Sequence, residues 1–154
     1  MEKRPFSLYL LLILVMIQAL GGIYGGFILT LSPSGKIMHI PLSILGGSPF
    51  TSFLIPGLIL LIVLGLFPAF ISFALIVRPK WTWPEVLNIY RGIHWAWTYT
   101  LYLGIMLIIW ILVEIMFIGY DILQTIFGLV GVAILISDFL PSNMRYFGWG
   151  KVLR

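Results

Sequence analysis

The chain has 154 residues, of which 61% are hydrophobic and 9% are charged, and its formal net charge is +4. Soluble domains carry about 25% charged residues, so this composition excludes an ordinary soluble domain and indicates a membrane protein. The absence of cysteine excludes disulfides, haem-thiolate centres, iron–sulfur clusters and thiolate zinc sites. We expect one all-α domain, residues 1–154, with four transmembrane helices in an up-down bundle.

The first predicted span covers residues 6–31, an almost unbroken apolar run. Its basic start and Leu-rich centre also suit a signal peptide, but the run is too long for a cleaved signal core, so we favour an uncleaved helix. Four glycines within residues 21–26 form two overlapping small-xxx-small pairs, which let helix backbones approach closely in lipid. We expect Gly22 and Gly25 to contact a neighbouring backbone. Gln18 is predicted to make an interhelical hydrogen bond, with a ligand contact as the alternative.

The predicted outer loop covers residues 32–52 and opens with the turn sequence Ser-Pro-Ser-Gly. It is too apolar to be freely solvated, so we expect a short hairpin or an interfacial helix over the bundle mouth. A cap over the helix ends is slightly favoured over a functional lid. The second predicted span covers residues 53–77. Pro56 and Pro68 interrupt it, which predicts a kink unless neighbours satisfy the backbone.

The third predicted span covers residues 94–118. It opens with His94 and an aromatic belt, and it carries Glu114 near its far end. An ionisable side chain inside a membrane helix is costly, so by default it is a functional-site hypothesis. The fourth predicted span, residues 122–140, follows a tight turn and ends near Asp138.

The basic residues predict the orientation of the chain. Only Lys36 lies in the outer loop, whereas the other eight lie at the N-terminus, in the second loop and in the tail: Lys3, Arg4, Arg78, Lys80, Arg91, Arg145, Lys151 and Arg154. Because cytoplasmic loops are enriched in Lys and Arg, we predict a multi-pass protein of the cell membrane with both termini cytoplasmic.

Residues 21–57 contain the motifs Gly-Gly-Ile-Tyr-Gly-Gly, Ser-Pro-Ser-Gly, Ile-Pro-Leu and Ser-Pro-Phe…Ile-Pro-Gly. On these turn and packing motifs the chain resembles small four-helix prokaryotic membrane proteins that usually carry no assigned function. The resemblance covers the first two spans and the start of the third. Such proteins are expected to have Asp-Pro-Ser-Gly at the first turn, and Ser32 here removes a possible acidic ligand. The resemblance implies a fold and no chemistry.

Two polar clusters are predicted, one towards each face of the membrane. The outer cluster is made of Glu114, Asp121 and Gln124, with His39 and Lys36 available from the loop. The candidate ligand-binding residues are Glu114, Gln18, Gln124, His39 and Trp110. The favoured interpretation of Glu114 is an anchor that fixes the loop to the bundle. The alternative is a site for a cation, a proton or the polar head of a lipid.

The inner cluster is a predicted structural clamp made by Arg91, His94 and Asp138, with Arg145 as a further partner. In an up-down bundle the start of the third span and the end of the fourth lie at the same depth. A charge-neutralising clamp is favoured over a catalytic dyad.

These features leave three classes of function open. A structural or accessory membrane component is slightly favoured. A binder of a lipid or small hydrophobic molecule, or less readily an enzyme acting on one, would use a pocket around Glu114. A proton or ion conduit ranks lowest. We expect membrane lipids as partners, a homo-oligomer or a larger membrane complex as candidate assemblies, and no cofactor, metal or nucleic acid.

Overall fold

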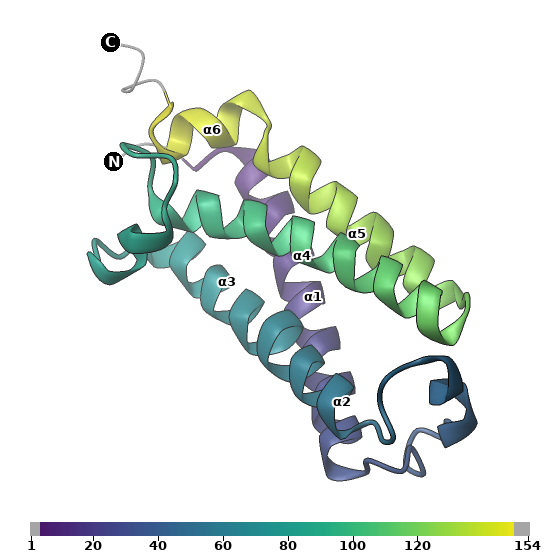
Figure 1. Ribbon diagram of the computed structural model, residues 1–154. Coiled ribbons are helices and arrows are strands. Elements are labelled where there is room, and N and C mark those ends of the chain that lie inside the picture. The colour runs from purple at the N-terminus through teal and green to yellow at the C-terminus, as the bar shows by residue number, and fades with distance from the viewer. Residues whose placement is uncertain (1–3, 150–154) are drawn as a thin grey trace.

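The computed structural model describes residues 4–149, and within them the chain is all-helical, as predicted, with no strand (Figure 1). Six α-helical segments, two short 3-10 helices and one π-helical turn are present in this described part: α1 (Phe6–Leu31), η1 (Leu42–Gly47), α2 (Leu54–Leu61), η2 (Ile62–Leu66), α3 (Phe67–Val77), η3 (Trp83–Leu87), α4 (Trp95–Ile118), α5 (Ile122–Asp138) and α6 (Pro141–Phe147).

Three rods are long and apolar enough to cross a membrane, namely α1, the continuous run α2–η2–α3 and α4. A fourth is present if α5 and α6, which meet at 65°, count as one bent segment. The bend follows from sequence, because Pro141 begins α6 and the residue before a proline avoids helical backbone angles. The fourth helix therefore ends at Asp138 rather than at residue 140.

Helix α1 packs along α2, η2 and α3 through glycines that lie against backbone. A Cβ atom on Gly22 would overlap the carbonyl oxygen of Leu64, and one on Gly26 would overlap the backbone of Leu61. From the other side, a Cβ atom on Gly65 would come within 2.8 Å of the Gly22 carbonyl carbon. The two rods are therefore in backbone-to-backbone contact, as small residues in membrane helices permit.

The prediction for Gly25 is wrong in its detail. The nearest atom to a Cβ at this position is Leu60 Cδ2, at 3.2 Å, which is the end of a flexible side chain. The close pair on α1 is Gly22 and Gly26, one helical turn apart, and Gly25 lies at the edge of the contact.

Pro68 does not break the second rod. It has no N–H to donate to the Leu64 carbonyl four residues earlier. The helix widens into the π-helical turn η2 at this point, and Gln18 Nε2 donates to the Leu64 oxygen over 3.0 Å. The interhelical hydrogen bond predicted for Gln18 is therefore present. Pro56 lies in the first turn of α2, where N–H groups have no helical partner, so it causes no break.

The helices form two hairpins, one of α1 and the second rod and one of α4 and α5. The two hairpins diverge towards the loop 32–53 (Figure 1). At one end, here called the α6 end, lie the start of α1, the connector 78–94 and α6. At the other, the η1 end, lie the loop 32–53 and the turn 119–121. Helix α1 contacts α5 as well as the second rod, α4 packs along α5, and α3 contacts α4.

The α6 end is tied together by contacts between segments distant in sequence. The His94 amide donates to the Phe147 carbonyl over 3.0 Å. The Arg78 guanidinium lies 4.3 Å from the centre of the Tyr146 ring, a distance typical of a cation–π contact. Helix α6 thus fixes the second and third rods to each other at this end only.

Candidate functional site

Two hollows lie along the seam between the second rod and α4. The one towards the η1 end has a volume of about 180 Å³, and the one towards the α6 end about 410 Å³. The first is lined by Ile59, Val63, Leu64, Met106, Ile109, Trp110 and Val113, and the second by Phe67, Leu87, Tyr99, Tyr102, Ile105 and Met106. Both are open to the surface of the molecule and present no polar surface.

The hollows follow one face of α4 and share Met106. From Tyr99 to Val113 this face spans ~21 Å at 1.5 Å per residue. The seam stays unfilled because α3 touches α4 near the α6 end, whereas the second rod diverges from α4 further along (Figure 1). We call these two adjacent apolar hollows together the α4 groove.

Glu114 lies beside the hollow of the α4 groove that is nearer the η1 end, but it does not line that hollow. It is half-buried, and its Oε1 accepts a hydrogen bond of 2.7 Å from Trp110 Nε1. Trp110 lines the groove and lies one helical turn before Glu114, so the indole joins the carboxylate to the groove wall. The i, i+4 spacing of these two residues in the sequence is the signal for this pair.

The partners expected for Glu114 from other elements do not reach it in the described residues. Gln124 Oε1 accepts from the Asp121 amide over 2.9 Å, in a capping box at the start of α5. His39 is exposed in the loop, with φ of 56°. No hydrogen bond joins either side chain to Glu114 within residues 4–149.

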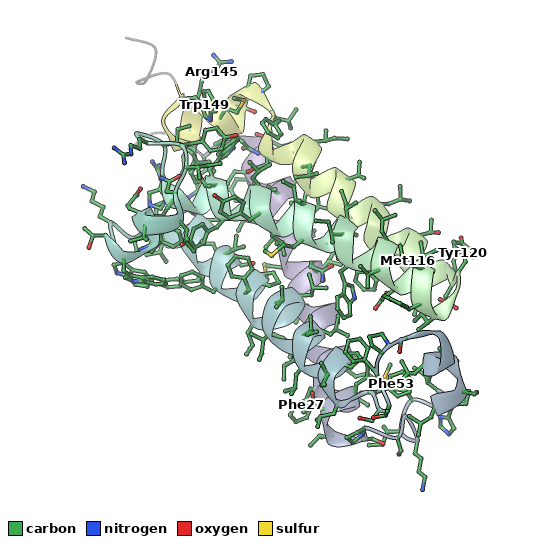
Figure 2. The ribbon with its side chains drawn as sticks, in the orientation of Figure 1. Phe27, Phe53, Met116, Tyr120, Arg145 and Trp149 are labelled. Atoms are coloured by element: carbon green, nitrogen blue, oxygen red, sulfur yellow. The ribbon has the colours of Figure 1, made fainter. Side chains whose placement is uncertain are left out.

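The loop 32–53 does fold over the η1 end, and its regular element is the 3-10 helix η1 rather than a hairpin. Within the loop, the Phe53 amide donates to the Pro33 carbonyl over 2.9 Å. Helix η1 contacts α4, and a Cβ on Gly47 would come 2.9 Å from the Phe117 carbonyl oxygen. The loop therefore bridges the two hairpins where they diverge, and Phe53, at the end of the loop, is labelled in Figure 2.

The predicted clamp on Asp138 is not formed in the described residues. Asp138 is fully buried, yet both carboxylate oxygens lack a hydrogen-bond partner. Arg91 is exposed, and Arg145 Nε donates to the Pro141 carbonyl and projects outward at the α6 end (Figure 2). The bend between α5 and α6 turns the tail cation away, which the sequence-based argument from depth did not include.

His94, the third member of the predicted clamp, caps α4 instead. Its Nδ1 accepts from the Ala96 amide and its Nε2 faces the Pro79 carbonyl, each over 3.2 Å. Both contacts are satisfied by a neutral ring with the proton on Nε2. Burial lowers the pKa of His94 below its ordinary value of 6.5, although the hydrogen bond to Pro79 opposes that shift.

Two asparagines that the sequence analysis did not single out organise the α6 end. Asn88 Nδ2 donates to the Ile93 carbonyl over 2.8 Å and fixes the connector 78–94. Asn143 Nδ2 donates to the Ser137 carbonyl over 2.7 Å. The presence of an Asn in an otherwise apolar chain is the sequence signal for these roles.

In the part of the chain that the structure describes, no cluster of three or more His, Cys, Asp or Glu could hold a metal ion. Comparisons with protein-family models, with curated proteins and with solved structures find no match. Any function must therefore be argued from the geometry of the chain itself, namely the α4 groove with its Trp110–Glu114 pair and the buried carboxyl group at the α6 end.

Proposed function

We propose that the chain is an integral membrane protein with four spans in up-down order, α5 and α6 forming a bent fourth span, and with both termini in the cytoplasm. The lengths and compositions of the rods support this proposal. The α6 end gathers the start of α1, the connector 78–94 and α6 (Figure 1). These segments carry most of the basic residues, as cytoplasmic segments of membrane proteins do.

Cysteine labelling tests this orientation, because the parent chain has no cysteine. A membrane-impermeant maleimide applied to intact cells should modify Lys36→Cys and spare Lys80→Cys. Both positions are exposed, so burial does not explain a difference between them. Opening the cells should make Lys80→Cys reactive. Labelling of position 80 alone in intact cells would reverse the proposed orientation.

We further propose that the protein binds a membrane lipid, with one acyl chain in the α4 groove and the polar head near Glu114. The groove is the observation that carries this proposal: its lining is wholly apolar, it is open at the side and it extends for about 21 Å along α4. An alkyl chain that follows α4 matches this shape. Membrane lipids reach such a groove without passing through water.

Selectivity must come from the polar end of the lipid. An acyl chain in the bilayer is already in an apolar surrounding, so entering the groove gains packing and little hydrophobic free energy. Trp110 occupies one oxygen of Glu114, and a carboxylate accepts several hydrogen bonds. The remaining acceptor capacity suits a head group that donates, such as the ammonium group of phosphatidylethanolamine.

Photoactivatable lipids in reconstituted vesicles test this proposal. A phosphatidylethanolamine probe should label the peptide around Ile109 and Val113 more strongly than a phosphatidylcholine probe, whose head group has no N–H donor. A tenfold preference would correspond to about 1.4 kcal/mol, the size of a charge-assisted hydrogen bond. Glu114→Gln should remove most of the preference and leave labelling by phosphatidylcholine unchanged.

Two methionines on α4 provide a matched pair of variants. Met106→Trp fills the point that both hollows share, and it should reduce labelling by both probes. Met116→Trp makes the same change at an exposed position and should have no effect (Figure 2). Equal labelling of the parent and Met106→Trp would mean that the groove holds no specific lipid. The structural or accessory role would then be the better proposal.

A further inference from the structure

A second polar site lies at the α6 end, away from the α4 groove. Asp138 is the last residue of α5 and has no exposed surface. Its backbone carbonyl accepts from Trp97 Nε1 over 2.9 Å, but neither carboxylate oxygen has a partner in residues 4–149. Buried polar groups in proteins are nearly always hydrogen-bonded, so each exception needs a physical explanation.

The same place holds an unpaired donor. Trp149 Nε1 is buried and has no hydrogen-bond partner in the described residues. The Trp149 ring packs edge-on against Trp97 with ring centres 5.7 Å apart, and Trp97 is the residue that reaches Asp138. Trp97 therefore contacts both Trp149 and the backbone of Asp138.

None of the cations in the described residues neutralises Asp138. Arg4 donates to the Ile76 carbonyl, and Arg78 lies over Tyr146. Lys80 and Arg91 are exposed on the connector. On the elements packed against α5, His94 of the third rod is engaged with Pro79 and Ala96, and Arg145 of α6 is turned outward (Figure 2).

A chain of hydrogen-bonded polar groups leads from the surface to the backbone carbonyl of Ser137, the neighbour of Asp138 in sequence. The hydroxyl groups of Ser142 and Ser7 lie 2.7 Å apart at the exposed end, and Ser7 Oγ donates to Asn143 Oδ1 over 2.8 Å. Asn143 is fully buried and donates to the carbonyl of Ser137, the residue before Asp138. The chain therefore ends at the backbone beside Asp138, and no hydrogen bond in residues 4–149 continues it to the carboxylate.

We propose that Asp138 is a binding site for a monovalent cation, either a proton or an alkali metal ion, which enters from the α6 end along Ser142, Ser7 and Asn143. An unpaired carboxylate is very costly to bury, and a single positive charge removes that cost. A water molecule alone would supply hydrogen bonds and no charge. A larger cation does not suit the site, because Asp138 and Trp97 are both without exposed surface.

Thermal unfolding of the purified chain in detergent tests the proposal. At constant ionic strength, choline is replaced by lithium, sodium or potassium, and a separate series varies the pH. A ligand that binds the folded state raises the unfolding temperature. The parent should therefore respond to one alkali ion if the site takes a metal ion, or become more stable as the pH falls if it takes a proton.

Two carboxyl-to-amide variants on α5 separate the site from the rest of the protein. Asp138→Asn should lose the response, whereas Asp121→Asn, at the other end of the same helix, should keep it. A parent that responds neither to alkali ions nor to pH would overturn the proposal even if Asp138→Asn failed to fold. An unchanged response in folded Asp138→Asn would overturn it as well.

A third variant tests for a partner within the chain. Lys151 lies outside the described residues, and Lys151→Gln should leave the cation response of the parent intact. If the parent shows no response, Lys151→Gln gains one, and the double variant with Asp138→Asn lacks it again, the carboxylate is paired with Lys151. That result would also overturn the proposal. The α4 groove takes no part in these measurements, so their outcome is independent of lipid binding.

Discussion

The second rod has two neighbours, and it meets them in opposite ways. Against α1, glycines bring the two backbones into contact, and no side chain could be added at Gly22 or Gly26 without displacing a helix. Against α4, large side chains such as Phe67 and Tyr99 meet, and two apolar hollows remain along the seam. One seam therefore has a single tight arrangement, whereas the other retains room for a ligand. In the proposed function, α1 is the scaffold and α4 is the wall of the proposed binding site.

The largest effect is expected at the tight seam. Gly22→Ala places a methyl group on the Leu64 carbonyl and must separate α1 from η2. Overpacking a well-packed core costs about 1–3 kcal/mol, and a clash with backbone should reach at least the upper end of that range. Thermal unfolding in detergent measures the loss of stability.

Gly25→Ala is the matched control for this change. Its Cβ meets only the end of the Leu60 side chain, which can rotate away. Alanine also has a helix propensity better than that of glycine by roughly 1 kcal/mol. The variant should therefore be as stable as the parent or more so. Equal losses in Gly22→Ala and Gly25→Ala would refute the one-sided packing of α1.

The sequence predicted the tight seam better than the loose one. Small-xxx-small spacing located the glycines, but which pair faces the second rod depends on the rotation of α1, and a symmetrical run of four glycines does not specify it. Gln18 was correctly expected to bond another helix. Its acceptor depends on Pro68 leaving the Leu64 carbonyl free, a relation between residues far apart in the chain.

The polar sites were less predictable because they depend on where helices bend and how connectors fold. Depth along the spans predicts that Asp138 lies beside Arg91, His94 and Arg145. The bend at Pro141 turns Arg145 away from Asp138. Asn88, which was not among the predicted site residues, fixes the connector through its hydrogen bond to the Ile93 carbonyl. The donor to Glu114 is Trp110, which lies four residues earlier on the same helix.

Gln18 joins the two seams, because the Leu64 carbonyl that it contacts belongs to a residue that also lines the α4 groove. Gln18→Met keeps the volume and removes the hydrogen bond. Interhelical hydrogen bonds in membrane proteins average about 0.6 kcal/mol, so a loss of roughly 1 kcal/mol in the free energy of unfolding is expected.

The same variant sharpens the comparison through lipid labelling. If the tight seam is an independent scaffold, Gln18→Met should lower stability and leave labelling in the α4 groove unchanged. A change in labelling at constant stability would show that the π-helical turn couples the two seams. Measuring both quantities on one preparation distinguishes these results.

The smallest effect is expected at His94, which fixes where α4 begins and hence where the loose seam closes. The neutral ring accepts the Ala96 amide at Nδ1, and protonation of that nitrogen removes the cap. Arg78 also disfavours the charged ring.

Because the pKa of His94 is lower in the folded chain than its ordinary 6.5, the unfolded state takes up the proton first as the pH falls. The cap's contribution to stability is present above pH 6.5 and is lost below it, down to the folded pKa. The loss should be about 0.5 kcal/mol, the lower end of the range for a capping interaction. His94→Asn retains a capping side chain that does not titrate, so its stability should not fall over this interval through residue 94. Subtracting its pH profile from that of the parent isolates the histidine from Asp138, and a flat difference would show that His94 does not titrate as a cap.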